Sequence, residues 1–273
     1  MKLIQNKIKF PRKINPKDAR EYFKKHKILK FLKNSINNNF SKDLSKQLYP
    51  WSNTTYSPEI MDLYRLHQFI ILNKRLTVLE FGSGWSSLIL AHALMINEKN
   101  FFKDTKKLRK SNLFELHILE NEKKYLNITK KRNASILGNF NKKINYFYSS
   151  CKMATFNNKF CTEYLKLPLV NPDFIYLDGP DQFKISGKKN NFTTNHTDMM
   201  PMVSDILKFE YFLIPGTIIV VDGRTANALF LKNNFQRKWD YFYDKYNDQS
   251  IFYLADKSLG NINDRMKVFY RSK

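Results

Sequence analysis

Short apolar runs alternate with helix-like stretches along most of this chain, and this alternation restricts the fold more than any other feature. The runs lie at residues 76–80, 115–119, 144–148, 173–178 and 216–221. Helix-like stretches separate them, at about 85–96, 122–133 and 200–212. Buried strands have this length, and strands alternating with helices form parallel sheets covered by crossover helices. The sequence therefore predicts an α/β fold with a doubly wound, mostly parallel sheet.

The two ends of the chain add further elements. Residues 1–56 show helix-like spacing and many lysines but no strand pattern, so we expect a basic N-terminal helical appendage before a domain at 57–273. Ser57-Pro58-Glu59 predicts the start of a helix to about Leu72, because serine caps helices and proline suits their first turn. A last helix and an antiparallel hairpin are expected at 224–234, 239–244 and 250–255.

Two polar insertions interrupt the alternation. We expect residues 97–112 to form a solvated loop and residues 180–199 to lie near the active site. The two cysteines, Cys151 and Cys161, lie ten positions apart without a C-x-x-C pattern, so they predict buried thiols rather than a disulfide framework or a zinc site.

Composition sets wider limits. The chain has 273 residues, 42% of them hydrophobic, which is enough for a full core. The N-terminus lacks the apolar region of a secretory signal, and no apolar run of about 18 residues occurs, so the expected location is cytoplasmic.

The net charge of +23 leaves two interpretations open. It is typical of a protein that contacts nucleic acid or an anionic membrane surface. Amino-acid bias is the favoured explanation, because the excess is mostly lysine, is spread along the chain and accompanies abundant asparagine and isoleucine. Arginine, the usual residue for specific phosphate recognition, contributes little. The oligomeric state is left open.

Acidic residues end four of the predicted strands: Glu80, Glu120, Asp178 and Asp222. A single acid at such a position often caps the next helix. Parallel sheets bind ligands beyond the carboxyl ends of their strands, however, and carboxylates gathered there repel one another and lose solvation. Four together favour a ligand with hydroxyl groups, positive charge or a metal ion.

The segment VLEFGSGWSSL, from Val78 to Leu88, describes the site more closely. Gly82 and Gly84 allow a tight turn and the close approach of a ligand, and the helix behind them presents free N–H groups. Glu120 is placed to accept hydrogen bonds from ribose hydroxyls, which predicts a nucleoside-like cofactor. A dinucleotide site is less consistent, because Ser87 replaces the third glycine of G-x-G-x-x-G and Glu80 would face a pyrophosphate.

These motifs resemble those of class I S-adenosylmethionine-dependent methyltransferases. Glu80-Phe81-Gly82-Ser83-Gly84 is similar to the E/D-x-G-x-G motif, and HILENE, PDFIYLDGPD and LIPGTIIVVDGR follow in the family's order from about 57 to 254. The resemblance implies a seven-stranded sheet with an antiparallel last strand. It also implies S-adenosylmethionine contacts at Glu80, Gly82, Gly84 and Glu120, and less directly at Ser86, while Trp85 is expected in the core.

The acceptor side of the site depends on a second group of residues. Asp178 is the first candidate to orient the acceptor or remove its proton, and His196 is a candidate general base because histidine titrates near neutral pH. The acceptor-binding candidates are Asp181, Asp222 and Arg224, although Arg224 could instead neutralise the neighbouring carboxylates.

A divalent metal is the alternative to a metal-free site. Metal-dependent O-methyltransferases carry an asparagine where this chain has Gly223, so no metal is expected, although Asn227 lies one helical turn further on. His67 lies in a predicted helix, and its side chain is expected to pack in the protein interior.

The choice of acceptor rests on absent motifs. The tetrapeptide NPDF precedes the fourth strand instead of following it, so it does not match the tetrapeptide of enzymes that methylate amino groups of bases. Enzymes that methylate C5 of cytosine carry a Pro-Cys nucleophile, and in this chain neither cysteine follows a proline. We therefore expect an O-directed methyltransferase acting on a small-molecule or glycan-type acceptor. Ribose methylation of RNA by the basic surface, and a non-catalytic binding protein that retains the fold, remain the alternatives.

Overall fold

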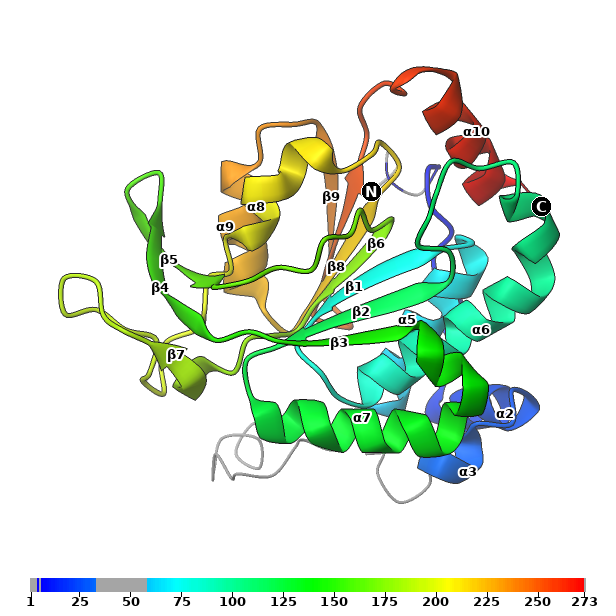
Figure 1. The fold of residues 1–273 in the computed structure, drawn as a ribbon, viewed down its shortest axis with the longest axis horizontal. Helices are drawn as coiled ribbons and strands as arrows, with labels where there is room; N and C mark the ends of the chain where they lie inside the picture. Colours follow the sequence, from blue (N-terminus) through cyan, green and yellow to red (C-terminus); the bar gives the residue numbers. More distant parts are fainter. Residues whose placement is uncertain (1–3, 5, 33–57, 273) are drawn as a thin grey trace.

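The computed structural model describes residues 4, 6–32 and 58–272, and its centre is a seven-stranded sheet (Figure 1). Strand order is β3-β2-β1-β6-β8-β10-β9. The strands are β1 (Thr77–Phe81), β2 (Glu115–Glu120), β3 (Ile144–Tyr148), β6 (Phe174–Leu177), β8 (Ile218–Asp222), β9 (Trp239–Asp244) and β10 (Gln249–Leu254). The first five pair in parallel, and β10 pairs antiparallel with both β8 and β9. The predicted α/β fold and its edge hairpin are confirmed.

Helices cover both faces of this sheet (Figure 1). One face packs on α5 (Ile60–Leu72), α6 (Trp85–Thr105) and α7 (Lys123–Leu137), and the other on α8 (Asp205–Phe209) and α9 (Thr225–Asn234). Side chains alternate between the two cores: Val78 and Tyr176 join the first, whereas Leu79 and Leu177 join the second. This period of two is what a strand buried on both faces requires.

The described part of the N-terminal segment packs on the first of these cores. It contains α2 (Pro16–Lys25) and α3 (Leu29–Leu32), and Phe23 and Leu32 are fully buried beside α5 and α6. The Asn15 side chain caps α2 by accepting a hydrogen bond from the Asp18 N–H at 2.9 Å. The predicted boundary at 56/57 lies at the edge of the undescribed residues 33–57 and stays a prediction.

Four helix predictions were wrong in extent, and the one at 122–133 ends too early, since α7 runs to Leu137. The α5 helix begins at Ile60 with Glu59 as its N-cap, and Ser57 lies outside the described residues. The α6 helix continues to Thr105, through part of the expected loop at 97–112, because buried Asn97 donates to two main-chain oxygens instead of facing water. The helix expected at 200–212 is the five-residue α8 followed by the 3₁₀ turn Glu210–Phe212, since residues 202–204 hydrogen-bond to Thr162 as extended chain.

A second, three-stranded sheet was not predicted. It consists of β4 (Cys151–Phe156), β5 (Lys159–Tyr164) and β7 (Ile185–Ser186), and it projects at the left of Figure 1. Asn157 and Asn158 both have positive φ, which is the two-residue turn that joins a tight hairpin. Cys151 and Cys161 lie in these strands as free, buried thiols, as expected.

The chain also ends in an unpredicted helix, α10 (Gly260–Arg271). Its residues Met266 and Tyr270 pack with Leu76 and Phe114, which lie at the amino-terminal ends of β1 and β2. In Figure 1, α10 lies at the upper right, on the side opposite the small sheet. None of the helices in the described ranges has both the length and the apolar character needed to cross a bilayer.

Candidate active site

Strand register places the four acidic strand ends on one face of the sheet. Glu80 pairs with Ile118 and with Tyr176, and Tyr176 pairs with Val220. The other three acids, Glu120, Asp178 and Asp222, each lie two residues beyond one of these partners. Because side chains alternate with a period of two, all four point to the face covered by α5, α6 and α7.

Glu80 lies under the first turn of α6. Its side chain is 1% exposed, and its two oxygens accept hydrogen bonds from the Ser86 hydroxyl at 2.5 Å and the Ser87 hydroxyl at 2.6 Å. Burial raises the pKa of Glu80 to about 8, although these two hydrogen bonds lower it in part. Ser86, predicted as a cofactor contact, therefore holds Glu80 in place.

Glu120, at the end of the neighbouring strand, is equally enclosed. It is 3% exposed and accepts hydrogen bonds from the Ser83 hydroxyl at 2.7 Å and the Glu122 N–H at 2.8 Å. Burial raises the pKa of Glu120 to about 7, against the effect of those donors. Among the described residues, no cation forms an ion pair with either Glu80 or Glu120.

The two glycines of the loop between these acids have different reasons to be glycine. Gly82 has a φ of +102°, and a Cβ there would lie 3.1 Å from the Gly179 nitrogen, so both its backbone and its surroundings exclude a side chain. Gly84 has an extended backbone, and a Cβ would meet only the Ser86 hydroxyl at 3.8 Å. Within the protein, nothing therefore requires glycine at position 84.

Asp178 and Arg224 form one connected unit at the ends of β6 and β8. The Asp178 side chain is 54% exposed, and its carboxylate lies 3.5 Å from the Arg224 Nε. Arg224 Nη2 also donates to the main-chain oxygens of Asp178 at 2.9 Å and Pro180 at 3.1 Å. Arg224 thus braces the loop after β6, in addition to neutralising Asp178.

Asp222 belongs to a network that sequence reasoning missed. The Tyr176 hydroxyl donates to it at 2.7 Å, and burial together with the nearby Asp178 carboxylate raises the pKa of Asp222 to about 7. Burial, and then Asp222, raise the pKa of Asp62 on α5 well above its usual range. Neighbouring Arg65, 5% exposed, donates to Gln249 and Asp244 at 2.8 Å. The helical spacing of α5 predicted only an apolar face, and gave no signal for these polar residues.

Asp181 faces its own loop rather than open space. Its carboxylate accepts from the Phe183 N–H at 2.9 Å, and its N–H donates to the Asn121 side chain at 2.9 Å. Asn121 directly follows Glu120 and also donates to the main chain of Asp181 and Lys184. It thereby ties the loop after β6 to the end of β2. Its place directly after Glu120 at the end of a predicted strand is the sequence feature that marks it.

Three further predicted positions lie in different surroundings. His196 is 57% exposed, and its Nδ1 accepts from the Asp198 N–H at 3.2 Å. The fully buried amide of Asn227 bonds to both main-chain groups of Val203, so it does not substitute as a metal ligand. Half-buried Trp85 packs, as expected, on the core between the sheet and α5, α6 and α7. The Arg132 guanidinium lies 3.9 Å from the centre of its ring. In the described part of the chain, no three His, Cys, Asp or Glu side chains are arranged to hold a metal ion.

Comparisons with known proteins give similarity in fold. No protein-family model matches the sequence, and no curated protein matches it either. The O-methyltransferase from Bacillus cereus, crystallised in complex with SAH, is 13% identical, with 93% of this chain and 96% of that chain covered and a TM-score of 0.38. The O-methyltransferase TomG from Streptomyces achromogenes, involved in tomaymycin synthesis and crystallised with SAM, is 12% identical, with 93% and 94% covered and a TM-score of 0.40. Neither match assigns an activity to this chain.

Proposed function

We propose that the chain is an S-adenosylmethionine-dependent methyltransferase that methylates an oxygen atom of a small-molecule or glycan-type acceptor. One observation carries the proposal. A glycine turn lies between two buried carboxylates, Glu80 and Glu120, on one face of a parallel sheet, and neither carboxylate is paired with a cation in the described part of the chain. A buried carboxylate without a cation is unfavourable unless it takes up a proton, as the raised pKa values of Glu80 and Glu120 reflect, or a ligand supplies hydroxyl groups or positive charge.

The residues present fit such a cofactor. The position where a Gly84 side chain would stand is open, and this is the space that a ligand lying over the loop needs. Glu120 lies at the edge of that loop and is held by the Ser83 hydroxyl, with capacity to accept further hydrogen bonds from a ribose. Glu80 fixes the first turn of α6 through Ser86 and Ser87, and a cationic ligand beside it would favour its ionised form.

The acceptor side is proposed from Asp178. When bound, S-adenosylmethionine supplies an electrophilic methyl group. Asp178 is half exposed at the same edge, and it is suited to accept the proton of an acceptor hydroxyl or to orient that hydroxyl. His196 is the second candidate base. Asp222 and Asp181 border the same region, whereas the hydrogen bonds of Arg224 favour a role in positioning the loop that carries Asp178.

Cofactor titration tests the first part of the proposal. Calorimetry with S-adenosylmethionine should show binding to the wild-type chain, and Glu120→Gln should weaken it about tenfold to a hundredfold, the usual effect of losing a hydrogen bond to a charged group. Glu115→Gln, at the start of the same strand, is the matched control and should bind normally. Absence of binding to the wild-type chain would contradict the enzyme proposal and favour a non-catalytic binding protein.

Methyl incorporation tests the acceptor. Labelled S-adenosylmethionine would be incubated with the protein and either a small-molecule extract or total RNA, with Asp178→Asn as the comparison. We expect label in the small-molecule fraction, and a loss of turnover in Asp178→Asn with cofactor affinity retained. Label in RNA would instead identify the ribose-methylating alternative.

A further inference from the structure

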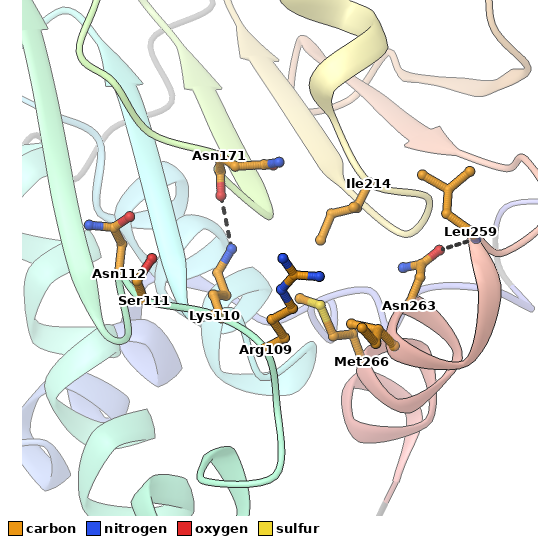
Figure 2. Close-up of a pocket in the computed structure, with 10 residues that line it drawn as sticks. Arg109, Lys110, Ser111, Asn112, Asn171, Ile214, Leu259, Asn263 and Met266 are labelled. Carbon is orange, nitrogen blue, oxygen red and sulfur yellow. Dashed lines mark hydrogen bonds between the residues drawn. The ribbon is translucent and has the colours of Figure 1, made fainter.

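A hollow of about 630 Å³ lies at the edge of the sheet opposite to the four acids. Asn112, Asn171 and Ile214 line it, and they precede β2, β6 and β8 respectively. Figure 2 shows these residues facing Leu259, Asn263 and Met266 from the start of α10. Because the strands are parallel, this hollow opens at the amino-terminal ends and is separate from the candidate active site.

The charged residues that line this hollow are Arg109 and Lys110, and no acidic residue lines it. In Figure 2 the Arg109 guanidinium points into the space between Lys110 and Ile214. Within the described ranges, Arg109 has no hydrogen bond or ion pair. Lys110 donates to the Asn171 main-chain oxygen at 2.9 Å and retains two further N–H groups. Arg109 is exposed and therefore available to an anion from outside the protein, whereas Lys110 beside it is partly buried, and burial lowers its pKa.

Strongly exposed apolar side chains belong to the segments that border this hollow, and one of them, Leu259, lines it. Leu169 is fully exposed, Phe212 is 77% exposed and Leu259 is 61% exposed. They share one neighbourhood, because the Asn171 side chain donates to the Phe212 main-chain oxygen at 2.8 Å while its own main-chain oxygen accepts from Lys110. Large apolar side chains so exposed around a polar centre mark surfaces that contact a partner or a membrane.

The form and charge of this edge favour a bilayer as its partner. Exposed apolar side chains from three separate segments accompany two cations at this edge, a combination suited to a surface with anionic head groups above an apolar interior. A second copy of the chain would bring the same cations face to face, and the net charge of +23 adds to that repulsion. We propose that the amino-terminal edge docks on an anionic phospholipid surface, with Arg109 and Lys110 at lipid phosphates and Leu169, Phe212 and Leu259 at the acyl-chain boundary.

Docking in this orientation has a consequence for the rest of the molecule. The carboxyl-terminal edge of the sheet carries Glu80, Glu120 and Asp178. It points away from the bilayer, because the docking edge lies at the amino-terminal ends of the same strands. A water-soluble acceptor would still reach that edge. The inference does not depend on the proposed function, because it concerns neither the cofactor nor the acceptor.

Vesicle flotation with matched charge variants tests the docking. The full chain would be mixed with vesicles of phosphatidylcholine alone or with one quarter phosphatidylglycerol. We expect binding to the anionic vesicles, weakened at least tenfold in the double variant Arg109→Glu with Lys110→Glu. The control, Lys188→Glu with Lys189→Glu in an exposed loop after β7, changes the net charge equally and should weaken binding less than threefold. An equal loss in both variants, or no loss in either, would overturn the proposal.

A labelling experiment gives an answer that does not depend on charge reversal. Both native cysteines are buried, so Phe212→Cys can be labelled selectively with an environment-sensitive fluorophore. Anionic vesicles should shift its emission to the blue, whereas a label at Leu229→Cys, an exposed position on α9, should stay unchanged. No shift at position 212, an equal shift at both positions, or a shift that depends on protein concentration without vesicles would each contradict membrane docking.

Discussion

The backbones of Gly82 and Gly179 are in direct contact. A Cβ on Gly179 would lie 2.6 Å from the Gly82 nitrogen and 2.7 Å from its Cα, which is closer than side chains approach a main chain. The loop after β1, which lies between the two buried carboxylates, therefore rests on the loop after β6, which carries Asp178. The contact fixes the spacing between the proposed cofactor and acceptor sides of the site.

Replacing each of two glycines separates packing from ligand access. Gly179→Ala should destabilise the fold by about 1 to 3 kcal/mol, because neither backbone segment can move away easily. Gly84→Ala should leave stability within about 0.5 kcal/mol, yet weaken binding of S-adenosylmethionine, since its new methyl group enters the open space over the loop. Urea unfolding and calorimetry on both variants would check this. Equal stability of the two variants would contradict the contact between the loops.

Glu120 should make the protein less stable as pH rises. Its pKa is about 7 in the folded state and near 4.5 when exposed, so between these values the folded chain binds more protons than the unfolded chain and stability falls with increasing pH. The difference corresponds to a loss on the order of 3 kcal/mol, which Glu120→Gln should remove. Urea unfolding between pH 4.5 and 7.5 would measure it. Parallel stability profiles for the two proteins would show that Glu120 is not held in this way.

A cluster of buried histidines should make the protein less stable as pH falls. The Tyr22 hydroxyl lies 2.6 Å from His67 Nδ1, and His67 Nε2 lies 3.0 Å from His92 Nδ1. Burial lowers the pKa of His92 from 6.5 to about 4, so between these values the unfolded chain binds more protons and stability is lost as pH falls. The wild-type chain should lose about 3 kcal/mol more than His92→Gln between pH 7 and pH 4.

This cluster joins the N-terminal helix α2 to α5 and α6. Protonation of the cluster should therefore loosen α2 before the rest of the fold. Hydrogen exchange at pH 4.5 should increase first in residues 16–32 of the wild-type chain. An unchanged difference between wild type and His92→Gln across this pH range would contradict the prediction.

Arg224 should control the order of the loop that carries Asp178. In Arg224→Ala the main-chain oxygens of Asp178 and Pro180 lose their donor, and hydrogen bonds to charged groups are worth about 1.5 to 3 kcal/mol. Hydrogen exchange of the amides at 178–184 should therefore become about ten to a hundred times faster. Lys232→Ala, at an exposed position on α9, is the control. Unchanged exchange in Arg224→Ala would show that Asn121 alone holds the loop.

Local patterns predicted much of the fold. The apolar runs became β1, β2, β3, β6 and β8, because a buried strand needs several consecutive apolar residues whatever its neighbours are. The aromatic-rich pair at 239–255 formed the predicted hairpin. Polar stretches misled, as at Asn97, because a polar side chain inside a helix can find buried main-chain partners that composition does not reveal. The small sheet was missed because its strands are short and polar on one side.

The sequence by itself determined that carboxylates and glycines stand at the ends of parallel strands, since their order along the chain and the strand period are local properties. Only the tertiary structure decided that Glu80, Glu120, Asp178 and Asp222 share one face, that Gly82 touches Gly179, and that Arg109 and Leu259 line one hollow. Most of these pairs join residues that are far apart in the sequence, such as Glu80 and Asp178. They follow from strand order and register, which depend on how the whole core packs and are not encoded in any one segment.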